Sequence, residues 1–347
     1  MIKVLIIDDS AMVRQSLKMA IETASDMKVI GVAPDPYVAK DLILRDKPDV
    51  LTLDIEMPRM DGLTFLTKIM KYFPIPTVIV SSLSAEGSDV SIEALERGAV
   101  EVISKPGTAY SLGEITPMLL DKIRASSKVD IAKHIERLKA MSKFKKQKQP
   151  KKQSSALVAT TNKILAIGAS TGGTQALETV LTSLPFNIPG TVIVQHMPAG
   201  FTKSFAERLN DACPFTVKEA VDGDSIQQGT VLIAPGNYHM RVERSGARYY
   251  VSLNQEKPEF FQRPAVEVLF RSVAENVGKN SVGVILTGMG ADGSTGLKSM
   301  YDEGAKTIAQ DERTSVVFGM PKEAIAQGGV MYVEPLQKIA DKILSLI

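Results

Sequence analysis

Residues 4–9, Val4-Leu5-Ile6-Ile7-Asp8-Asp9, are a short apolar run that ends in two carboxylates. The same arrangement recurs where Val50-Leu51-Thr52-Leu53 ends at Asp54, and where Val100-Glu101-Val102-Ile103-Ser104 ends at Lys105-Pro106. Apolar runs of this length, bounded by polar residues, are consistent with strands of a buried parallel sheet. Because open α/β folds place their ligands at the carboxyl edge of the sheet, we expect three carboxylates and one ammonium to converge there.

This convergence predicts a site for a divalent cation and a phosphoryl group. Clustered carboxylates attract a hard cation such as Mg²⁺, and one carboxylate can then act as the nucleophile toward phosphorus while Lys105 neutralises the added charge. The alternative is that acids follow strands only because strand ends meet water. We favour the site, because Ser81-Ser82 also ends a fourth apolar run, Thr77-Val78-Ile79-Val80.

The first 123 residues or so resemble a response-regulator receiver domain with a flavodoxin-like fold. The resemblance is carried by Asp8, Asp9, Asp54, Ser81, Lys105-Pro106 and the loop Asp54-Ile55-Glu56-Met57-Pro58-Arg59-Met60-Asp61-Gly62. It implies phosphorylation of Asp54. It also implies that Mg²⁺ is bound by Asp9, Asp54 and the backbone carbonyl of Glu56, with Asp8 in support.

The same resemblance assigns Ser81 as the hydroxyl residue that moves toward the phosphoryl group and Lys105 as the residue that bonds it. One position departs from the common pattern, because Val102 stands where many receivers carry an aromatic residue. A switch that works by rotation of that ring is therefore not expected here.

Length and composition limit the remaining possibilities. A chain of 347 residues is expected to form two domains with separate cores. Its 41 basic and 39 acidic residues give a net charge of +2, which argues against nucleic-acid binding. The single Cys213 excludes an internal disulfide framework, and no C-x-x-C or His-rich cluster suggests zinc. We expect a cytoplasmic monomer without a signal peptide or membrane insertion.

Residues 124–152 carry 11 basic and 2 acidic side chains, an excess of +9. Ile131, Ile135, Leu138 and Met141 recur at helical spacing, which predicts a helix that leaves the first domain before a polar stretch at 144–150. We interpret residues 124–161 as a basic linker. Attraction to acidic receptors or anionic lipid is the alternative, and a solvated tether is favoured because charge runs usually are solvated.

Residues 162–347 show the pattern of a second doubly wound α/β domain, Rossmann-like and hydrolytic. Helical patterns at 175–184, 201–211 and 264–277 lie between apolar runs that predict parallel strands. The strand candidates are Ile164-Leu165-Ala166-Ile167, Thr191-Val192-Ile193-Val194, Val231-Leu232-Ile233-Ala234 and Val282-Gly283-Val284-Ile285-Leu286.

The segment Gly168-Ala169-Ser170-Thr171-Gly172-Gly173 follows the first of these strands and fits G-x-S-x-G, a turn that presents a serine hydroxyl at a sheet edge. A glycine-rich phosphate or dinucleotide loop is the alternative, but Ser170 occupies the second glycine's place in G-x-G-x-x-G. His196 and Asp292 each lie just beyond another strand candidate. Nucleophilic hydrolysis requires this set: a hydroxyl, a base and an acid that fixes the imidazole tautomer.

Two further considerations concern the base. The chain order Ser, His, Asp differs from the order in α/β-hydrolases, so an ordinary esterase fold is not expected. His134 lies in the charged linker, which leaves His196 and His239 as candidates. We favour His196, because His239 follows a Gly-Asn turn, where a hairpin arm with a structural or substrate-contacting histidine is expected.

Residues 162–347 resemble the catalytic domain of the chemotaxis protein-glutamate methylesterase (CheB) family, and with the receiver the resemblance covers the whole chain. It is carried by 168–173, 234–236, Gln195-His196-Met197-Pro198-Ala199-Gly200-Phe201-Thr202, Leu286-Thr287-Gly288-Met289-Gly290-Ala291-Asp292-Gly293 and Gly319-Met320-Pro321. It implies that Ser170 attacks a γ-glutamyl methyl ester on the cytoplasmic helices of a chemoreceptor, with His196 as base then acid and Asp292 orienting it.

The family resemblance also implies that backbone N–H groups, including that of Met289, hold the oxyanion, with Thr171 adding a polar contact. Hydrolysis of glutaminyl amides is expected as a companion activity. A chemotaxis histidine kinase is the expected phosphodonor, and Mg²⁺ is expected only in the receiver, with no cofactor for the esterase.

We hypothesise that the unphosphorylated receiver covers the Ser170 crevice, and that phosphorylation of Asp54 exposes it through Ser81. Two other classes of protein, an adaptor and a transcription factor, are less consistent with the sequence. An adaptor with a decayed triad is disfavoured by intact Ser170, His196 and Asp292. A transcription factor is disfavoured because the second domain lacks a compact helix-turn-helix module and the basic excess lies in the linker.

Overall fold

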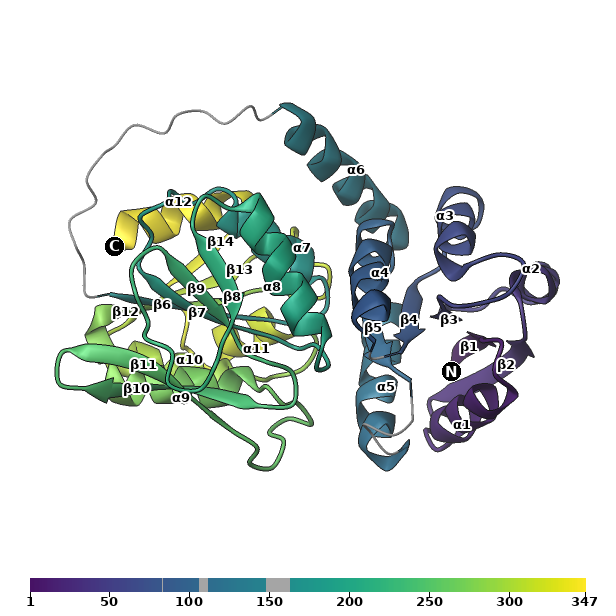
Figure 1. The fold of residues 1–347 in the computed structure, drawn as a ribbon, viewed down its shortest axis with the longest axis horizontal. Coiled ribbons are helices and arrows are strands. Elements are labelled where there is room, and N and C mark those ends of the chain that lie inside the picture. Colours follow the sequence, from purple (N-terminus) through teal and green to yellow (C-terminus); the bar gives the residue numbers. More distant parts are fainter. Residues whose placement is uncertain (83, 106–111, 148–162) are drawn as a thin grey trace. The chain divides into compact units, whose positions relative to one another are not determined.

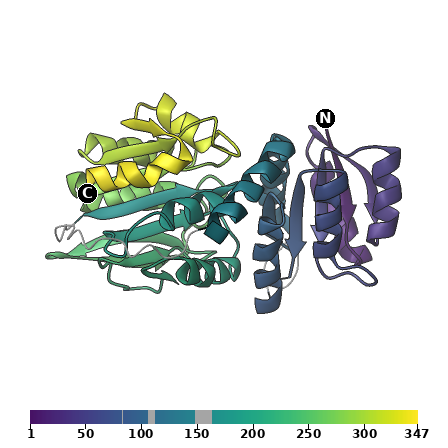
Figure 2. The same cartoon turned by 90° about the horizontal axis from the view of Figure 1, so that it is seen from above.

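The computed structural model describes residues 1–82, 84–105, 112–147 and 163–347, and the chain divides into two compact units, Met1–Lys151 and Lys152–Ile347. Both units contain a parallel sheet with helices on its two faces (Figures 1 and 2). This confirms the predicted class of two doubly wound α/β domains. In the part of the chain that the structure describes, no helix combines the length and apolarity needed to cross a bilayer.

The first unit, Met1–Lys151, is the one expected to be a receiver and is called the receiver unit below. It has a five-stranded sheet in the order β2-β1-β3-β4-β5, and all of its strand pairs are parallel. Strand order reverses between β1 and β3, so their carboxyl ends form the crevice where ligands bind in such sheets. The strands are β1 Ile2–Ile7, β2 Met27–Ala33, β3 Val50–Asp54, β4 Thr77–Ser81 and β5 Glu101–Ser104, and the helices are α1 Ala11–Glu22, α2 Pro36–Arg45, α3 Gly62–Tyr72, α4 Ala85–Glu96, α5 Leu112–Ser127 and α6 Ile131–Gln147.

Side-chain caps begin four of the helices that follow the strands of this sheet. Ser10, Asp35, Asp61 and Ser84 each accept a hydrogen bond from a backbone N–H of the first turn that follows. Such caps satisfy N–H groups that otherwise have no intrahelical partner. They keep the connecting loops short and hold them at the sheet edge.

Helix α6 confirms the helix predicted after the first domain, but His134 is not solvated as its place in a charged linker suggested. The side chain is only 2% exposed. Burial lowers the pKa of His134 to about 4, against a hydrogen bond to the backbone of Ala99. The first turns of α6 therefore pack against the receiver, and the contact boundary between the units falls at Lys151 and Lys152, inside the predicted linker.

The catalytic unit has a seven-stranded parallel sheet in the order β14-β13-β12-β6-β7-β9-β8, with a separate antiparallel hairpin β10-β11. All four predicted strands are present as β6, β7, β9 and β12, and the three predicted helices as α7, α8 and α9. The strands are β6 Ile164–Ala169, β7 Gly190–Gln195, β8 Thr216–Glu219, β9 Thr230–Ile233, β10 His239–Ser245, β11 Arg248–Asn254, β12 Ser281–Ile285, β13 Lys306–Gln310 and β14 Tyr332–Glu334.

The remaining elements of this unit are α7 Gly173–Leu181, α8 Phe201–Ala212, α9 Val266–Asn276, the 3-10 turn Gly278–Asn280, α10 Ser294–Asp302, α11 Met320–Ala326 and α12 Leu336–Leu346. Strand β6 lies between β12 and β7, so strand order reverses there and the carboxyl ends of these three strands share one crevice. One continuous core of buried residues runs from β6 and β7 to α9, α10 and α11.

Candidate functional sites

The carboxyl ends of β1 and β3 bring the predicted acidic residues of the receiver together. Oxygens of Asp8, Asp9 and Asp54 lie within 4.8 Å of one another. Lys105, just beyond β5, places Nζ 2.7 Å from Asp54 Oδ2 and 3.5 Å from Asp8 Oδ2. Asp8 and Asp54 are each 1% exposed, whereas Asp9 is exposed. The cluster thus has two buried carboxylates and one that is exposed to solvent.

Charge in this cluster is not balanced by protein groups alone. Burial raises the pKa of Asp54 from an ordinary 3.8 to about 6, although Lys105 opposes the shift. Burial also raises the pKa of Asp8. Three carboxylates face one ammonium, and a hard divalent cation is the partner that oxygen donors of this kind prefer. The donor set therefore fits Mg²⁺.

The loop after β3 is folded tightly against the site. A Cβ at Gly62 would lie 2.1 Å from the backbone oxygen of Asp54, so only glycine fits there. Glu56 donates its backbone N–H to Asp54 Oδ1 at 3.3 Å, which turns the residue-56 backbone toward the carboxylate. The chain thus passes so close to the backbone of Asp54 that position 62, where α3 begins, requires glycine.

Ser81 and Lys105 are held next to each other by the sheet. Ser81 pairs with Ser104 across β4 and β5, and its carbonyl accepts the backbone N–H of Lys105 at 2.8 Å. The Ser81 hydroxyl is buried and donates to the carbonyl of Gly87 at 3.3 Å. Val102 is buried two pairs further back in β5, opposite Ile79. The hydroxyl therefore has a long hydrogen bond that it can exchange.

In the catalytic unit, sheet register brings together the three segments that hold Ser170, His196 and Asp292. Ala169 of β6 pairs with Gln195 of β7, so Ser170 and His196 both follow that pair directly. Their backbones are joined to neighbouring segments, because His196 N donates to Ala169 O at 3.2 Å and Ser170 N donates to the carbonyl two residues beyond β12 at 3.0 Å. All three side chains are buried.

The segment after β12 lies directly against the serine. A Cβ at Gly288 would be 2.8 Å from Ser170 Cβ, so the backbone of residues 287–289 passes beside the predicted nucleophile. Met289, the predicted oxyanion donor, is in this segment. Thr171 is 1% exposed, and its Oγ1 has no hydrogen-bond partner among the described residues. A buried hydroxyl without a partner can bond a polar group of a ligand.

Asp292 holds the histidine. Its Oδ2 lies 2.7 Å from His196 Nε2. A carboxylate accepts at this position, so the neutral imidazole carries its proton on Nε2 and Nδ1 is its basic nitrogen. The carboxylate also accepts the backbone N–H groups of Val266 and Glu267, each at 2.8 Å. These are the first two N–H groups of α9, whose own N-cap residue, Ala265, provides no side-chain cap.

Glu267, which was not predicted from the sequence, caps helix α10 in turn. Its Oε2 accepts the backbone N–H of Gly296 in the first turn of α10 at 2.9 Å. Helix α10 begins after Gly293, which has no side chain to cap it. The acid before α10 thus caps α9, and the acid in the first turn of α9 caps α10. Burial raises the pKa of Glu267, and Asp292 adds to that shift while the Gly296 bond opposes it.

His239 has a different role from His196. It is fully buried at the start of β10, the hairpin arm on which it was expected. Nδ1 accepts the backbone N–H of Ala265 at 3.2 Å, and Nε2 lies 3.1 Å from the carbonyl of Lys257. Burial lowers the pKa of this imidazole, although the Lys257 bond opposes the shift. Both ring nitrogens therefore bond backbone groups of the segment that leads into α9.

Comparison with known proteins gives a family for each unit. Residues 4–116 match the response regulator receiver domain, and residues 165–343, slightly more than half of the chain, match CheB methylesterase. The fold and the two sites therefore define a receiver joined to a hydrolase unit.

Full-length relatives share this domain order. A protein-glutamate methylesterase/protein-glutamine glutaminase 2 of Syntrophus aciditrophicus is 52% identical over 348 residues, covering 100% of this chain and 99% of that protein. The corresponding protein of Salmonella typhimurium is 48% identical, covering 100% and 97%. The solved CheB methylesterase catalytic domain of Thermotoga maritima matches with a TM-score of 0.52 at 42% identity, over 53% of this chain and 98% of that domain. The chain belongs to the CheB methylesterase family.

The acidic cluster leads to a prediction about stability. A folded-state pKa near 6 means that folded Asp54 holds its proton above pH 3.8, so its contribution to stability falls as pH rises from about 4 to 6. Without Mg²⁺, Asp54→Asn should therefore stabilise the receiver at pH 7.5 by up to about 3 kcal/mol, and by much less at pH 4.5. Hydrogen exchange of the β3 amides measures this, and added Mg²⁺ should reduce the difference. A less stable variant at pH 7.5 without Mg²⁺ would contradict the assignment.

The reciprocal caps lead to a second prediction. Glu267→Gln keeps an oxygen for Gly296 N–H, whereas Glu267→Ala leaves that donor buried and unbonded, at a cost of about 0.5–2 kcal/mol. The alanine variant should unfold at lower urea concentration and weaken the low-field proton resonance of His196 Nε2–H, because α9 is no longer fixed against α10. The glutamine variant should retain both properties. Equal losses in the two variants would show that charge, and not capping, is what Glu267 supplies.

Proposed function

We propose that the chain hydrolyses γ-methyl esters of glutamate side chains on chemoreceptor helices, with Ser170 as nucleophile, His196 as base and Asp292 as orienting acid. The chain belongs to a family of phosphorylation-regulated methylesterases. The observation that carries the assignment of residues is the 2.7 Å contact between His196 Nε2 and Asp292 Oδ2, beside a serine on the adjacent strand end.

In the acylation step, His196 Nδ1 takes the hydroxyl proton as Ser170 Oγ bonds the ester carbonyl carbon. The carbonyl oxygen becomes an oxyanion, for which we assign the backbone N–H of Met289 as a donor and Thr171 Oγ1 as a further polar contact. Each such donor contributes about 10²–10³ in rate. His196 then returns its proton to the leaving oxygen, the carbon–oxygen bond to the methoxy group breaks, and methanol departs.

Deacylation uses the same groups in reverse roles. His196 removes a proton from water, water attacks the acyl carbon, and Ser170 recovers its proton as glutamate is released. Asp292 stabilises the imidazolium and keeps the ring oriented, because two helical N–H groups fix the carboxylate beside the ring. A glutaminyl amide presents the same carbonyl carbon with ammonia as the leaving group. We therefore assign receptor deamidation to the same triad.

Control belongs to the receiver. We assign Asp54 as the residue phosphorylated from a chemotaxis histidine kinase, with Asp9, Asp54 and the Glu56 carbonyl holding Mg²⁺ and Asp8 in support. When bound, the metal neutralises charge on the phosphoryl oxygens. Lys105 then bonds the new phosphoryl group, and Ser81 exchanges its long bond to Gly87 for one to phosphate. Phosphorylation thus changes a local charge and the backbone next to β4.

The choice of base is tested by comparing the two buried histidines. His196→Gln should lower methanol release from methylated receptor membranes by about 10⁴ or more, as Ser170→Ala should, and the double variant should be scarcely slower because triad residues act as a unit. His239→Gln should lower the unfolding temperature more than the rate, since its ring bonds only backbone groups. Near-normal turnover in His196→Gln, with loss in His239→Gln, would reverse the assignment.

Coupling between the two units is tested by removing the receiver. A fragment of residues 152–347 contains a core of its own. If the receiver restrains catalysis, the fragment should release methanol faster than the unphosphorylated full-length protein. A small-molecule phosphodonor with Mg²⁺ should activate the full-length protein only, and Asp54→Asn should abolish that response while leaving the basal rate. A fragment slower than the resting enzyme would exclude simple restraint and require the receiver to assist the active site.

A further inference from the structure

The loop before α9 contains a two-residue reverse turn with an unusual sequence. Glu259 and Gln262 exchange backbone hydrogen bonds of 3.2 and 2.8 Å. Between them, Phe260 and Phe261 have φ angles of 51° and 61°. Positive φ at both central residues is the geometry of a type I′ turn, which strongly favours Asn-Gly, Asp-Gly or Gly-Gly. Two bulky residues adopt it here against their backbone preference.

Neither phenylalanine contributes a buried side chain in return. Phe260 is 47% exposed and Phe261 is 74% exposed. Folding therefore gains little from either ring, while the backbone is strained at both positions. Strained residues of this kind are found where the surrounding structure forces a conformation that function uses. We name residues 259–262 the aromatic turn.

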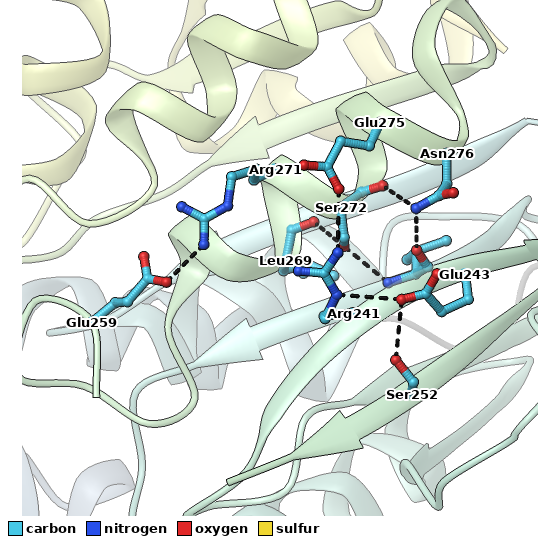
Figure 3. Close-up of polar contacts among 10 residues, drawn as sticks. Arg241, Glu243, Ser252, Glu259, Leu269, Arg271, Ser272, Glu275 and Asn276 are labelled. Carbon is cyan, nitrogen blue, oxygen red and sulfur yellow. Dashed lines mark hydrogen bonds and ion pairs between the residues drawn. The ribbon is translucent and has the colours of Figure 1, made fainter. Parts of the chain in front are cut away.

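The aromatic turn is fixed at both ends. Glu259 forms an ion pair of 2.7 Å with Arg271 of α9 (Figure 3). On the other side, the Arg263 guanidinium donates to Asn237 Oδ1 at 2.6 and 3.0 Å, and to the carbonyl of Gln255 at 3.1 Å. The rings are thus presented on a rigid base, so ordering them costs a ligand little conformational entropy.

Helix α9 is itself anchored to the hairpin. Ser272 Oγ accepts the backbone N–H of Val242 in β10 at 2.9 Å, and Asn276 donates to the carbonyl of the same residue at 3.0 Å. Arg241 of β10 pairs with Glu275 at 3.2 Å (Figure 3). The aromatic turn, α9 and the hairpin are therefore joined by side-chain contacts.

Two separate connections place the turn at the rim of the triad. Downstream, Val266 is five residues beyond Phe261 and donates its N–H to Asp292. The second connection runs through Arg263, whose guanidinium donates to Asn237, a residue upstream of the turn that follows Gly236. A Cβ at Gly236 would lie 2.2 Å from the backbone nitrogen of Ala199, three residues after His196. The turn is joined on one side to the segment that orients the acid and on the other to the loop of the base.

We infer that the aromatic turn docks the substrate helix that carries the glutamate methyl ester. This rests on the proposed function, because the occupant is the segment that must lie across this rim for its ester to reach Ser170. The exposed face of such a helix carries long polar side chains whose methylene stems cover apolar area, and two adjacent rigid rings can pack against those stems. The turn supplies affinity for the helix and takes no part in the chemistry at the ester.

The decisive variant is Phe260→Asn with Phe261→Gly, which installs the residues that this turn geometry prefers. The variant should unfold at the same or a higher temperature than the wild type. With phosphodonor and Mg²⁺, its kcat/KM for a methylated receptor cytoplasmic fragment should fall roughly ten- to a hundredfold, the range for loss of aromatic anchors. Its kcat/KM for a short peptide with a single γ-methyl glutamate should be unchanged.

Phe186 provides the matched control. It is 56% exposed and precedes β7, at the amino end of the sheet and opposite the triad. Phe186→Asn should leave both substrates unaffected. As a second measurement, calorimetry of the receptor fragment with Ser170→Ala protein, with and without the turn substitutions, should show the same ten- to a hundredfold loss in affinity.

Four outcomes would overturn the inference. An unchanged receptor rate would exclude docking, and equal losses on both substrates would mean that the turn shapes the triad. A faster resting enzyme on both substrates would mean that the turn restrains this chain. A change in sedimentation would mean that it binds a second copy. Failure of the wild type on both substrates would instead refute the proposed function, which keeps the two claims separate.

Discussion

The Asp292 carboxylate accepts hydrogen bonds from three donors, and the arrangement of the catalytic unit follows from satisfying them. A carboxylate that is only 2% exposed needs hydrogen-bond donors in place of the water it has left. Here the donors are one imidazole and the first two N–H groups of α9, at the positive end of the helix dipole. Anything that holds α9 also holds the acid, which is why the β10-β11 hairpin belongs to the active site although it contributes no reacting group.

Both units use the carboxyl edge of a parallel sheet, but they treat buried charge in opposite ways. In the receiver, the acids at the ends of β1 and β3 are underprovided with protein donors, and their pKa values rise. That shortage makes the edge receptive to a cation and then to a phosphoryl group. In the catalytic unit Asp292 contacts two backbone N–H groups and one imidazole nitrogen, so we assign it the task of holding that ring in place. The same architecture thus gives a receiver site that can accept added charge and a second site, around Asp292, whose hydrogen bonds are already formed.

Local sequence was sufficient for the elements whose signal is local. The apolar runs that became β1, β3, β4, β6, β7 and β12 were readable, and so were the residues that follow them, because the carboxyl ends of parallel strands converge whatever lies between. The choice of His196 over His239 as the base also rested on position and stays a prediction; the structure adds that His196 contacts Asp292, whereas His239 bonds backbone groups. Edge strands such as β14, three residues long, carry too few residues for a pattern.

Contacts between distant residues could not be read in this way. The capping of α9 by an acid 26 residues downstream, and of α10 by Glu267, leaves no periodic trace, since neither helix has a capping residue of its own. His134 was hidden by its neighbours, because a strongly basic stretch indicates solvent even when one histidine on it is buried against Ala99. The aromatic turn was likewise invisible, because Phe-Phe is among the least expected pairs for its backbone geometry.

The burial of the nucleophile has a consequence for selectivity. Ser170, the proposed nucleophile, is only 5% exposed, so little of its side chain is open to a helix backbone at the surface. The reacting carbonyl must therefore reach Ser170 at the end of a side chain, and the methylene groups of that side chain set its reach. A glutamate side chain has two of these and an aspartate has one, a difference of little more than an ångström in reach. We therefore expect the proposed site to hydrolyse an aspartate methyl ester at the same receptor position more slowly than a glutamate ester, without any contact that distinguishes the two carbonyl groups.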